Sequence, residues 1–68
     1  MLEAYIIDRD NEYINFIEKL DDTKCYIGKE SSRTGEVTGY YTYGNYVNFG
    51  KYVTDVFDIK DLIPYNRG

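Results

Sequence analysis

The chain has 68 residues, which is room for one domain, and a chain of this length buries only about 60% of the surface that its unfolded form exposes. Nine tyrosines supply much of the hydrophobic fraction of 43%, so we expect tyrosine rings to take core places that leucine and valine usually fill. The formal net charge of −4 and the pI near 4.5 argue against nonspecific binding to duplex nucleic acid and to anionic membranes. The acids are concentrated early in the chain: residues 1–30 hold eight acids and four bases, and residues 31–68 hold four of each.

Cysteine usage and the N-terminal sequence bear on the cellular compartment. The single cysteine, Cys25, excludes an intramolecular disulfide and fits a reducing compartment. The first residues carry no basic leader, and no apolar run is long enough to cross a bilayer. We therefore expect a single domain over residues 1–68, located in the cytoplasm.

The first third of the chain allows two interpretations. Residues 2–7 are largely apolar and rich in strand-forming types, which predicts a short first strand. The next apolar residues recur at the spacing of one helical face: Tyr13, Phe16, Ile17 and Leu20. This spacing predicts a helix over residues 11–21, capped by Asp10 or Asn11. The alternative is a hairpin that turns at residues 9–11 and continues as a strand over 13–18, although the alternation there is poor.

The middle of the chain predicts strands and a tight hairpin. Residues 24–27 form a short strand that ends at Gly28, and residues 29–36 have the composition of a loop. In residues 37–53, Gly44-Asn45 lies between two aromatic runs, as a two-residue hairpin turn would. The register of that hairpin makes Gly39 face Gly50. One face then carries Tyr41, Tyr43, Tyr46 and Tyr52, and the more apolar face, which we expect to be buried, carries Tyr40, Val47, Phe49 and Val53.

The remaining residues complete the predicted fold. Residues 55–59 alternate as a strand, and residues 62–65 read as a closing turn because Pro64 disfavours helix at Ile63. The sequence therefore predicts an α+β domain, a small antiparallel sheet of about five strands with one short helix. An all-β barrel of the SH3-like or OB-like kind is the alternative, should residues 13–19 be extended.

Several residue patterns argue against catalysis and metal binding. Histidine is absent, which removes the commonest general base and metal ligand. The acids of residues 8–12 have the rhythm of a calcium loop, but Tyr13 and Lys19 occupy the positions that require Gly and Glu. We interpret Cys25 as a core thiol. The sequence thus predicts no catalytic residue, no metal and no cofactor, and the chain is not expected to be an enzyme.

The predicted tyrosine strip is the main indication of function. Exposed tyrosines are frequent anchors of protein interfaces, and carboxylates add association rate. We therefore expect a non-catalytic protein-binding module, of the type of small acidic inhibitors encoded by phages and mobile elements, that covers a basic surface of a target protein. The expected partner-binding residues are Tyr41, Tyr43, Tyr46, Tyr52, Glu18, Asp21 and Asp22.

Two further partners are compatible with the same residues. The rings could stack on the bases of a nucleotide or of single-stranded nucleic acid. Arg33, Lys51 and Arg67 would then meet the phosphates. A homodimer could form through the strip or through an exposed edge strand.

Overall fold

The computed structural model describes residues 3–66. In chain order the elements are β1 (Glu3–Arg9), β2 (Tyr13–Asp21), β3 (Lys24–Ser31), β4 (Val37–Tyr43), α1 (Phe49–Phe57) and β5 (Ile63–Pro64). The predicted first strand is confirmed and extends further along the chain than expected; Leu2, its predicted first residue, lies outside the described residues. No helix in the described part of the chain is long and apolar enough to span a membrane.

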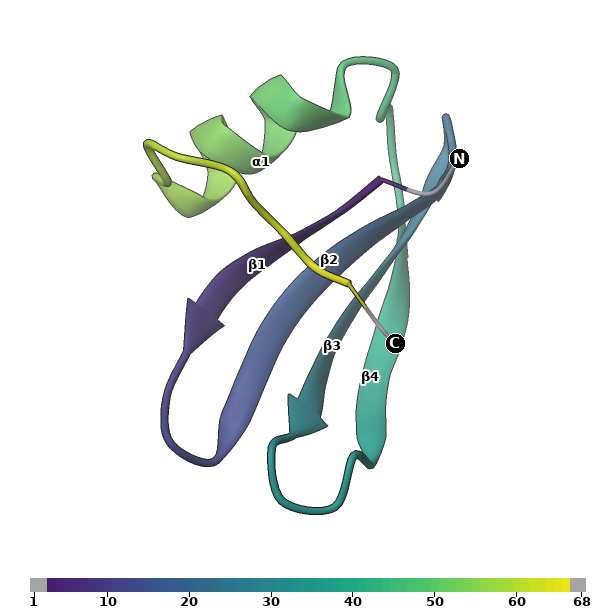
Figure 1. Ribbon diagram of the computed structural model, residues 1–68. Helices are drawn as coiled ribbons and strands as arrows, with labels where there is room; N and C mark the ends of the chain where they lie inside the picture. Colours follow the sequence, from purple (N-terminus) through teal and green to yellow (C-terminus); the bar gives the residue numbers. More distant parts are fainter. Residues whose placement is uncertain (1–2, 67–68) are drawn as a thin grey trace.

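The five strands form one open antiparallel sheet in the order β4-β3-β2-β1-β5. The α+β class with about five strands and one short helix is confirmed. The sheet does not close into a barrel, although β2 is extended as the barrel alternative required. Figure 1 shows α1 over one end of the sheet, while the β1–β2 and β3–β4 loops project from the other end.

The predicted helix over residues 11–21 is wrong, and the hairpin alternative is the observed structure. Phe16 and Ile17 are neighbours in β2 and both are fully buried, because this central strand is covered on both faces. Burial on both faces removes the alternation by which a strand is usually identified. The carboxylate of Asp10 accepts hydrogen bonds from the backbone N–H groups of Glu12 and Tyr13, both at 2.8 Å, so it stabilises the β1–β2 turn instead of capping a helix.

The hairpin predicted at Gly44-Asn45 is also absent. β3 continues past Gly28 and pairs with β4 through a turn that contains Gly35, whose φ of 75° suits glycine. After β4 the backbone N–H groups of Gly44 and Tyr46 donate to the carbonyl oxygens of Thr23 and Asp22, at 3.0 and 2.7 Å. These two bonds hold the chain against the β2–β3 turn and direct it into α1.

The helix forms where the sequence predicted strands. Phe49, Val53 and Phe57 recur at a spacing of four, which places them on one helical face. Asn48 caps the first turn by accepting a hydrogen bond from the Lys51 N–H at 3.4 Å. Asp58 ends the helix in the left-handed conformation, with φ 52°. The strand predicted over residues 55–59 is therefore wrong, since α1 extends to Phe57.

The core lies between α1 and one face of the sheet. Its buried members are Ile17, Cys25, Tyr46, Phe49 and Val53. The prediction of the buried face is right for two residues and wrong for the other two, because Tyr40 and Val47 are 60% and 68% exposed.

The last segment is a short strand instead of the predicted closing turn. β5 pairs with β1, with Ile63 opposite Ile6 and Pro64 opposite Tyr5. The N–H of Tyr65 then donates to the carbonyl of Ala4 at 2.9 Å. β5 thereby carries Tyr65 to the side of the sheet that faces away from α1.

Candidate functional site

One face of the sheet has no helix on it, and we call it the open face. Side chains alternate along a strand, so Ile17, which packs under α1, places Phe16 and Glu18 on the opposite side of β2. The register then continues across the sheet: Glu18 lies opposite Tyr26 of β3, and Tyr26 lies opposite Tyr41 of β4. The strand pairing thus gathers residues from three strands on the open face.

Four rings form a continuous aromatic cluster on this face: Phe16, Tyr26, Tyr41 and Tyr65. Phe16 and Tyr65 stack with their ring centroids 4.1 Å apart and their planes 5° from parallel. Tyr26 lies 5.9 Å from Phe16 and 5.1 Å from Tyr41, with tilted planes in both pairs. The cluster therefore runs from the central strand to the edge strand β4, and Tyr65 and Phe16 are its buried end.

Two glycines make room for this cluster. Gly28 and Gly39 lie opposite each other in β3 and β4, so the predicted pairing of Gly39 with Gly50 is wrong. A Cβ on Gly28 would lie 2.6 Å from the Tyr26 ring, and a Cβ on Gly39 would lie 2.8 Å from the Tyr26 hydroxyl oxygen. The Tyr26 ring thus fills the space beside these two glycines and covers their backbone.

The open face carries charges of both signs, because Arg9 of β1 lies opposite Ile14 and so shares this face with Lys24, Glu18 and Glu30. The Lys24 ammonium lies 4.5 Å from the centroid of the Tyr41 ring, a cation–π contact. The hydroxyl of Tyr65 donates to a carboxylate oxygen of Glu30 at 2.6 Å. Glu18 adds a second carboxylate beside Tyr26. Two acids and one base therefore surround the aromatic cluster.

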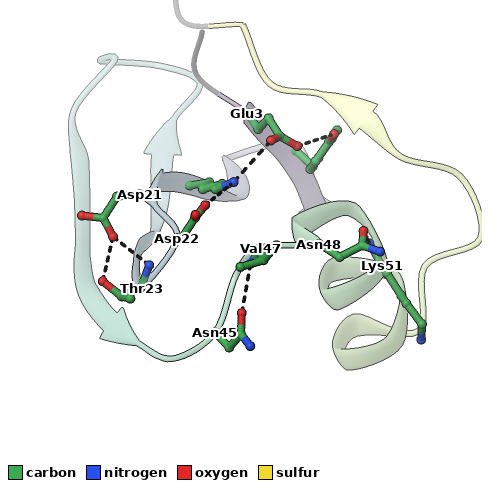
Figure 2. Close-up of polar contacts among 10 residues, drawn as sticks. Glu3, Asp21, Asp22, Thr23, Asn45, Val47, Asn48 and Lys51 are labelled. Atoms are coloured by element: carbon green, nitrogen blue, oxygen red, sulfur yellow. Dashed lines mark hydrogen bonds and ion pairs between the residues drawn. The ribbon is translucent and has the colours of Figure 1, made fainter.

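The β2–β3 turn carries Asp21 and Asp22, both exposed, at one end of the open face. Asp21 accepts hydrogen bonds from the backbone N–H and hydroxyl of Thr23, at 2.8 and 2.9 Å. These bonds stabilise the carboxylate and lower the pKa of Asp21. Lys19 lies 3.0 Å from Asp22 and 3.8 Å from Glu3, and its hydrogen bond to Asp22 raises the pKa of Lys19 (Figure 2).

The structure divides the predicted tyrosine strip between the two sides of the sheet. Tyr41 and Tyr43 lie on the open face with Glu18, and their side chains are 54% and 73% exposed. Tyr46 is buried under α1, where Tyr52 packs against it edge to face at 4.9 Å. Tyr46 and Tyr52 therefore belong to the core, because the hairpin that would have placed them beside Tyr43 does not form.

Sequence reasoning missed three members of the cluster, Phe16, Tyr26 and Tyr65. Phe16 was assigned to a helix, and Tyr65 to a closing turn. A signal for Tyr26 was present, since the polar residues 29–36 lie between Gly28 and Gly39, and a hairpin that turned at residues 33 and 34 would pair these two glycines. Two facing glycines next to an aromatic residue indicate a ring that covers them.

The bases that could meet phosphates lie away from the open face or outside the described residues. Arg33 borders a shallow groove of about 530 Å³ at the loop end of the sheet, where Lys29 lies over the ring of Tyr13. Lys51 is on α1 and pairs with Asp55 at 2.5 Å. Arg67 lies outside the described residues. The structure thus brings none of the described bases named for phosphate contact to the aromatic cluster.

The described residues offer little for metal or thiol chemistry. Within residues 3–66, no three histidine, cysteine, aspartate or glutamate side chains are grouped so that they could hold a metal ion. Cys25 is fully buried, and its Sγ lies 2.9 Å from the Thr42 hydroxyl. The open face is consequently the feature from which a function can be argued.

Comparison of this chain with protein-family models, with curated proteins and with solved structures found no match. A function for this chain must therefore be inferred from the chemistry of the open face.

Proposed function

We propose that this chain is a non-catalytic module that binds another protein through its open face. The observation that carries the proposal is the aromatic cluster, which ends in the exposed Tyr41 at the edge of the sheet, with the exposed Tyr43 on the same face of β4. A tyrosine side chain can bury about 150–250 Å². Large rings of this kind, held by their neighbours before a partner arrives, lose little conformational entropy on binding.

The rings are better arranged for a protein than for stacked bases. A base needs a free ring face, but Phe16 and Tyr65 already stack on each other, and Lys24 lies over Tyr41. The nearby carboxylates of Glu18 and Glu30 would repel phosphates. A protein partner can instead contact ring edges, hydroxyls and the exposed Tyr43 together.

Charge favours a partner with a basic surface. Glu18 lies within the open face, and the exposed Asp21 extends the negative charge beyond its end. The charge of Asp22 is offset by its ion pair with Lys19. The net charge of −4 has the same sign, so attraction to a basic patch would accelerate encounter. A small acidic chain that covers such a patch acts as an inhibitor by occlusion, as small phage and mobile-element inhibitors do, and we place its action in the cytoplasm.

The first prediction concerns the two exposed tyrosines. The double substitution Tyr41→Ala and Tyr43→Ala should weaken binding of the partner at least about 30-fold, because truncation of interface anchors costs about 2 kcal/mol or more. It should leave the domain folded, since both rings are more than half exposed. The measurement is affinity capture from nuclease-treated lysate followed by titration of the retained protein with wild type and variant.

Tyr40→Ala is the matched control, because Tyr40 is an exposed tyrosine of the same strand that points to the side of α1. It should retain the partner. Loss of the partner with Tyr40→Ala but not with the double variant would place the interface on the side of the sheet that carries α1 and would contradict the proposal. Recovery of nucleic acid alone from untreated lysate would favour the stacking alternative.

The charge of the partner is tested separately. For a basic partner, binding should weaken as salt rises, and Glu18→Gln should slow association.

A further inference from the structure

The two edges of the sheet are built differently. β5, at one edge, has two residues and ends in Pro64, and a proline or a very short strand blocks pairing with further strands. β4, at the other edge, has seven residues, Val37–Tyr43, and contains neither a charged residue nor a proline. Its pairing with β3 shows no bulge. β4 therefore lacks each of the features that proteins use to protect an edge strand.

The outer side of β4 is also uncovered. No strand of residues 3–66 pairs with β4 other than β3, and the loop that follows it turns back toward the β2–β3 turn. Tyr40, Tyr41 and Tyr43 are each more than half exposed. The backbone groups on this side, together with these rings, are available to another strand.

The sequence of β4 is complementary to itself when it runs antiparallel. With Tyr40 opposite its own copy, Thr38 of one strand lies opposite Thr42 of the other, and Gly39 lies opposite Tyr41. Threonine pairs and aromatic residues beside glycine are favourable cross-strand neighbours. No charged residues meet in this register, although each chain carries a net charge of −4. Another protein's strand would need to match this pattern, whereas a second copy does so by symmetry.

We propose that two copies of this chain pair through β4 in antiparallel register about Tyr40 to form a symmetric dimer. The two-fold axis passes between the two copies of β4, midway between the two Tyr40 residues, and is perpendicular to the sheet. The two sheets then join into one, and both open faces lie on the same side. Each copy keeps its own open face, so binding of a partner does not require the dimer, and formation of the dimer does not depend on the proposed binding function.

The size of the contact sets the expected strength. With about 200 Å² for each tyrosine side chain, the exposed parts of six rings amount to roughly 700 Å². Stable interfaces bury about 1,200 Å² or more, so the contact would stay below this size even with the exposed parts of all six rings buried. Main-chain hydrogen bonds between the two β4 strands add to its stability. The dimer should therefore be weak, with a dissociation constant on the order of 10–100 µM.

Sedimentation equilibrium of the purified chain, from about 1 µM to about 1 mM, tests this dimer. Tyr40→Lys places two like charges opposite each other and should raise the dissociation constant about tenfold or more. Val47→Lys is the matched control, because Val47 is similarly exposed and lies in the loop before α1; it should leave association unchanged. Circular dichroism verifies that both variants are folded.

Cysteine cross-linking tests the register independently. Tyr40→Cys brings two thiols together at the axis, where paired Cα atoms lie about 4.5–5.5 Å apart, within disulfide range. Tyr43→Cys would separate them by about 20 Å, and the wild-type Cys25 is buried. Oxidation should therefore cross-link Tyr40→Cys alone. Monomers at every concentration, an association that Tyr40→Lys leaves intact, or equal cross-linking at both positions would overturn the proposal, whether or not a partner protein is found.

Discussion

Tyr46 is the residue whose environment departs furthest from what the sequence suggested. It is 2% exposed, and its hydroxyl lies 2.9 Å from the hydroxyl of Thr42, which in turn lies 2.9 Å from the thiol of Cys25. This series of hydrogen bonds gives the Tyr46 hydroxyl a partner, although the rest of the ring is surrounded by the core. Burial, and then the neighbouring Cys25, raise the pKa of Tyr46 from 10.0 to about 12.

The raised pKa makes a prediction for alkaline solution. Between pH 10 and pH 12 the Tyr46 hydroxyl ionises in the unfolded chain but stays protonated in the folded one, so the free energy of unfolding falls as the pH rises. Tyr46→Phe should be less stable by about 1 kcal/mol at pH 8, because a hydrogen bond is lost, but should decline less steeply above pH 10. Urea unfolding of both proteins from pH 8 to pH 12 measures this, and parallel curves would contradict the assignment to Tyr46.

At the scale of elements, the composition predicted the class of fold but not the place of the helix. The spacing of Tyr13, Phe16, Ile17 and Leu20 is helical, yet these residues form a central strand. Phe16 and Ile17 are neighbours in this strand and point to opposite faces. Both are buried because Tyr65 covers one face of β2 and α1 covers the other. A tertiary contact from residue 65 cannot be derived from a local pattern, and it outweighs that pattern.

The prediction for the residues of α1 was wrong in the opposite sense, because strands were expected where a helix forms. Tyr52 and Val53 are strand-forming types, and Gly44-Asn45 is a typical hairpin turn, so local propensity favoured strands. The helical spacing of Phe49, Val53 and Phe57 was nevertheless present. The hydrogen bonds from the loop after β4 to the β2–β3 turn decided between the two, and they join segments that are about 20 residues apart.

Two glycines show that β4 and α1 differ in how well they accept a larger side chain. A Cβ on Gly39 would overlap the backbone of β3 at the Ile27 carbonyl oxygen and lie 2.6 Å from the Gly28 Cα. A Cβ on Gly50, in α1, would only reach ordinary contact with Leu62 at 3.4 Å. Gly39→Ala should therefore lower the free energy of unfolding by about 1–3 kcal/mol, and Gly50→Ala should raise it by about 0.5–1 kcal/mol. Thermal unfolding compares the two, and equal effects would show that β3 and β4 can separate at little cost.

At the scale of the whole molecule, the sheet has a helix on one side, while on the other side Tyr65 covers Phe16 and Tyr26 covers Gly28 and Gly39. Tyr41 and Tyr43 could be placed on a shared face from the alternation of one strand, and the structure brings both to the open face. Glu18, which was predicted on a helix, shares this face only because residues 13–21 form β2. The rest of the aromatic cluster could not be predicted, since Tyr65 reaches Phe16 only after β5 has paired with β1. The site thus depends on the pairing of β5 with β1, the longest-range strand pairing among residues 3–66.

Removal of that cover should be costly. Tyr65→Ala exposes Phe16 and leaves Glu30 without its donor, so we expect a loss of about 3 kcal/mol in the free energy of unfolding. Ile63→Ala, in the same strand but 47% exposed, should cost less than about 1 kcal/mol. Urea unfolding measures both. Similar losses for the two variants would mean that β5 stabilises the sheet through its backbone pairing alone.

The pairing of β5 with β1 also affects the order in which the fold can form. The first four strands form a meander in which each strand pairs with the one before it, so they can assemble before β5 joins the sheet. Tyr65 follows the end of β4 by 22 residues, and its stacking on Phe16 waits for the long-range pairing of β5 with β1. A chain that has formed only the first four strands therefore leaves Phe16 without its cover, and we expect such a chain to be prone to aggregation.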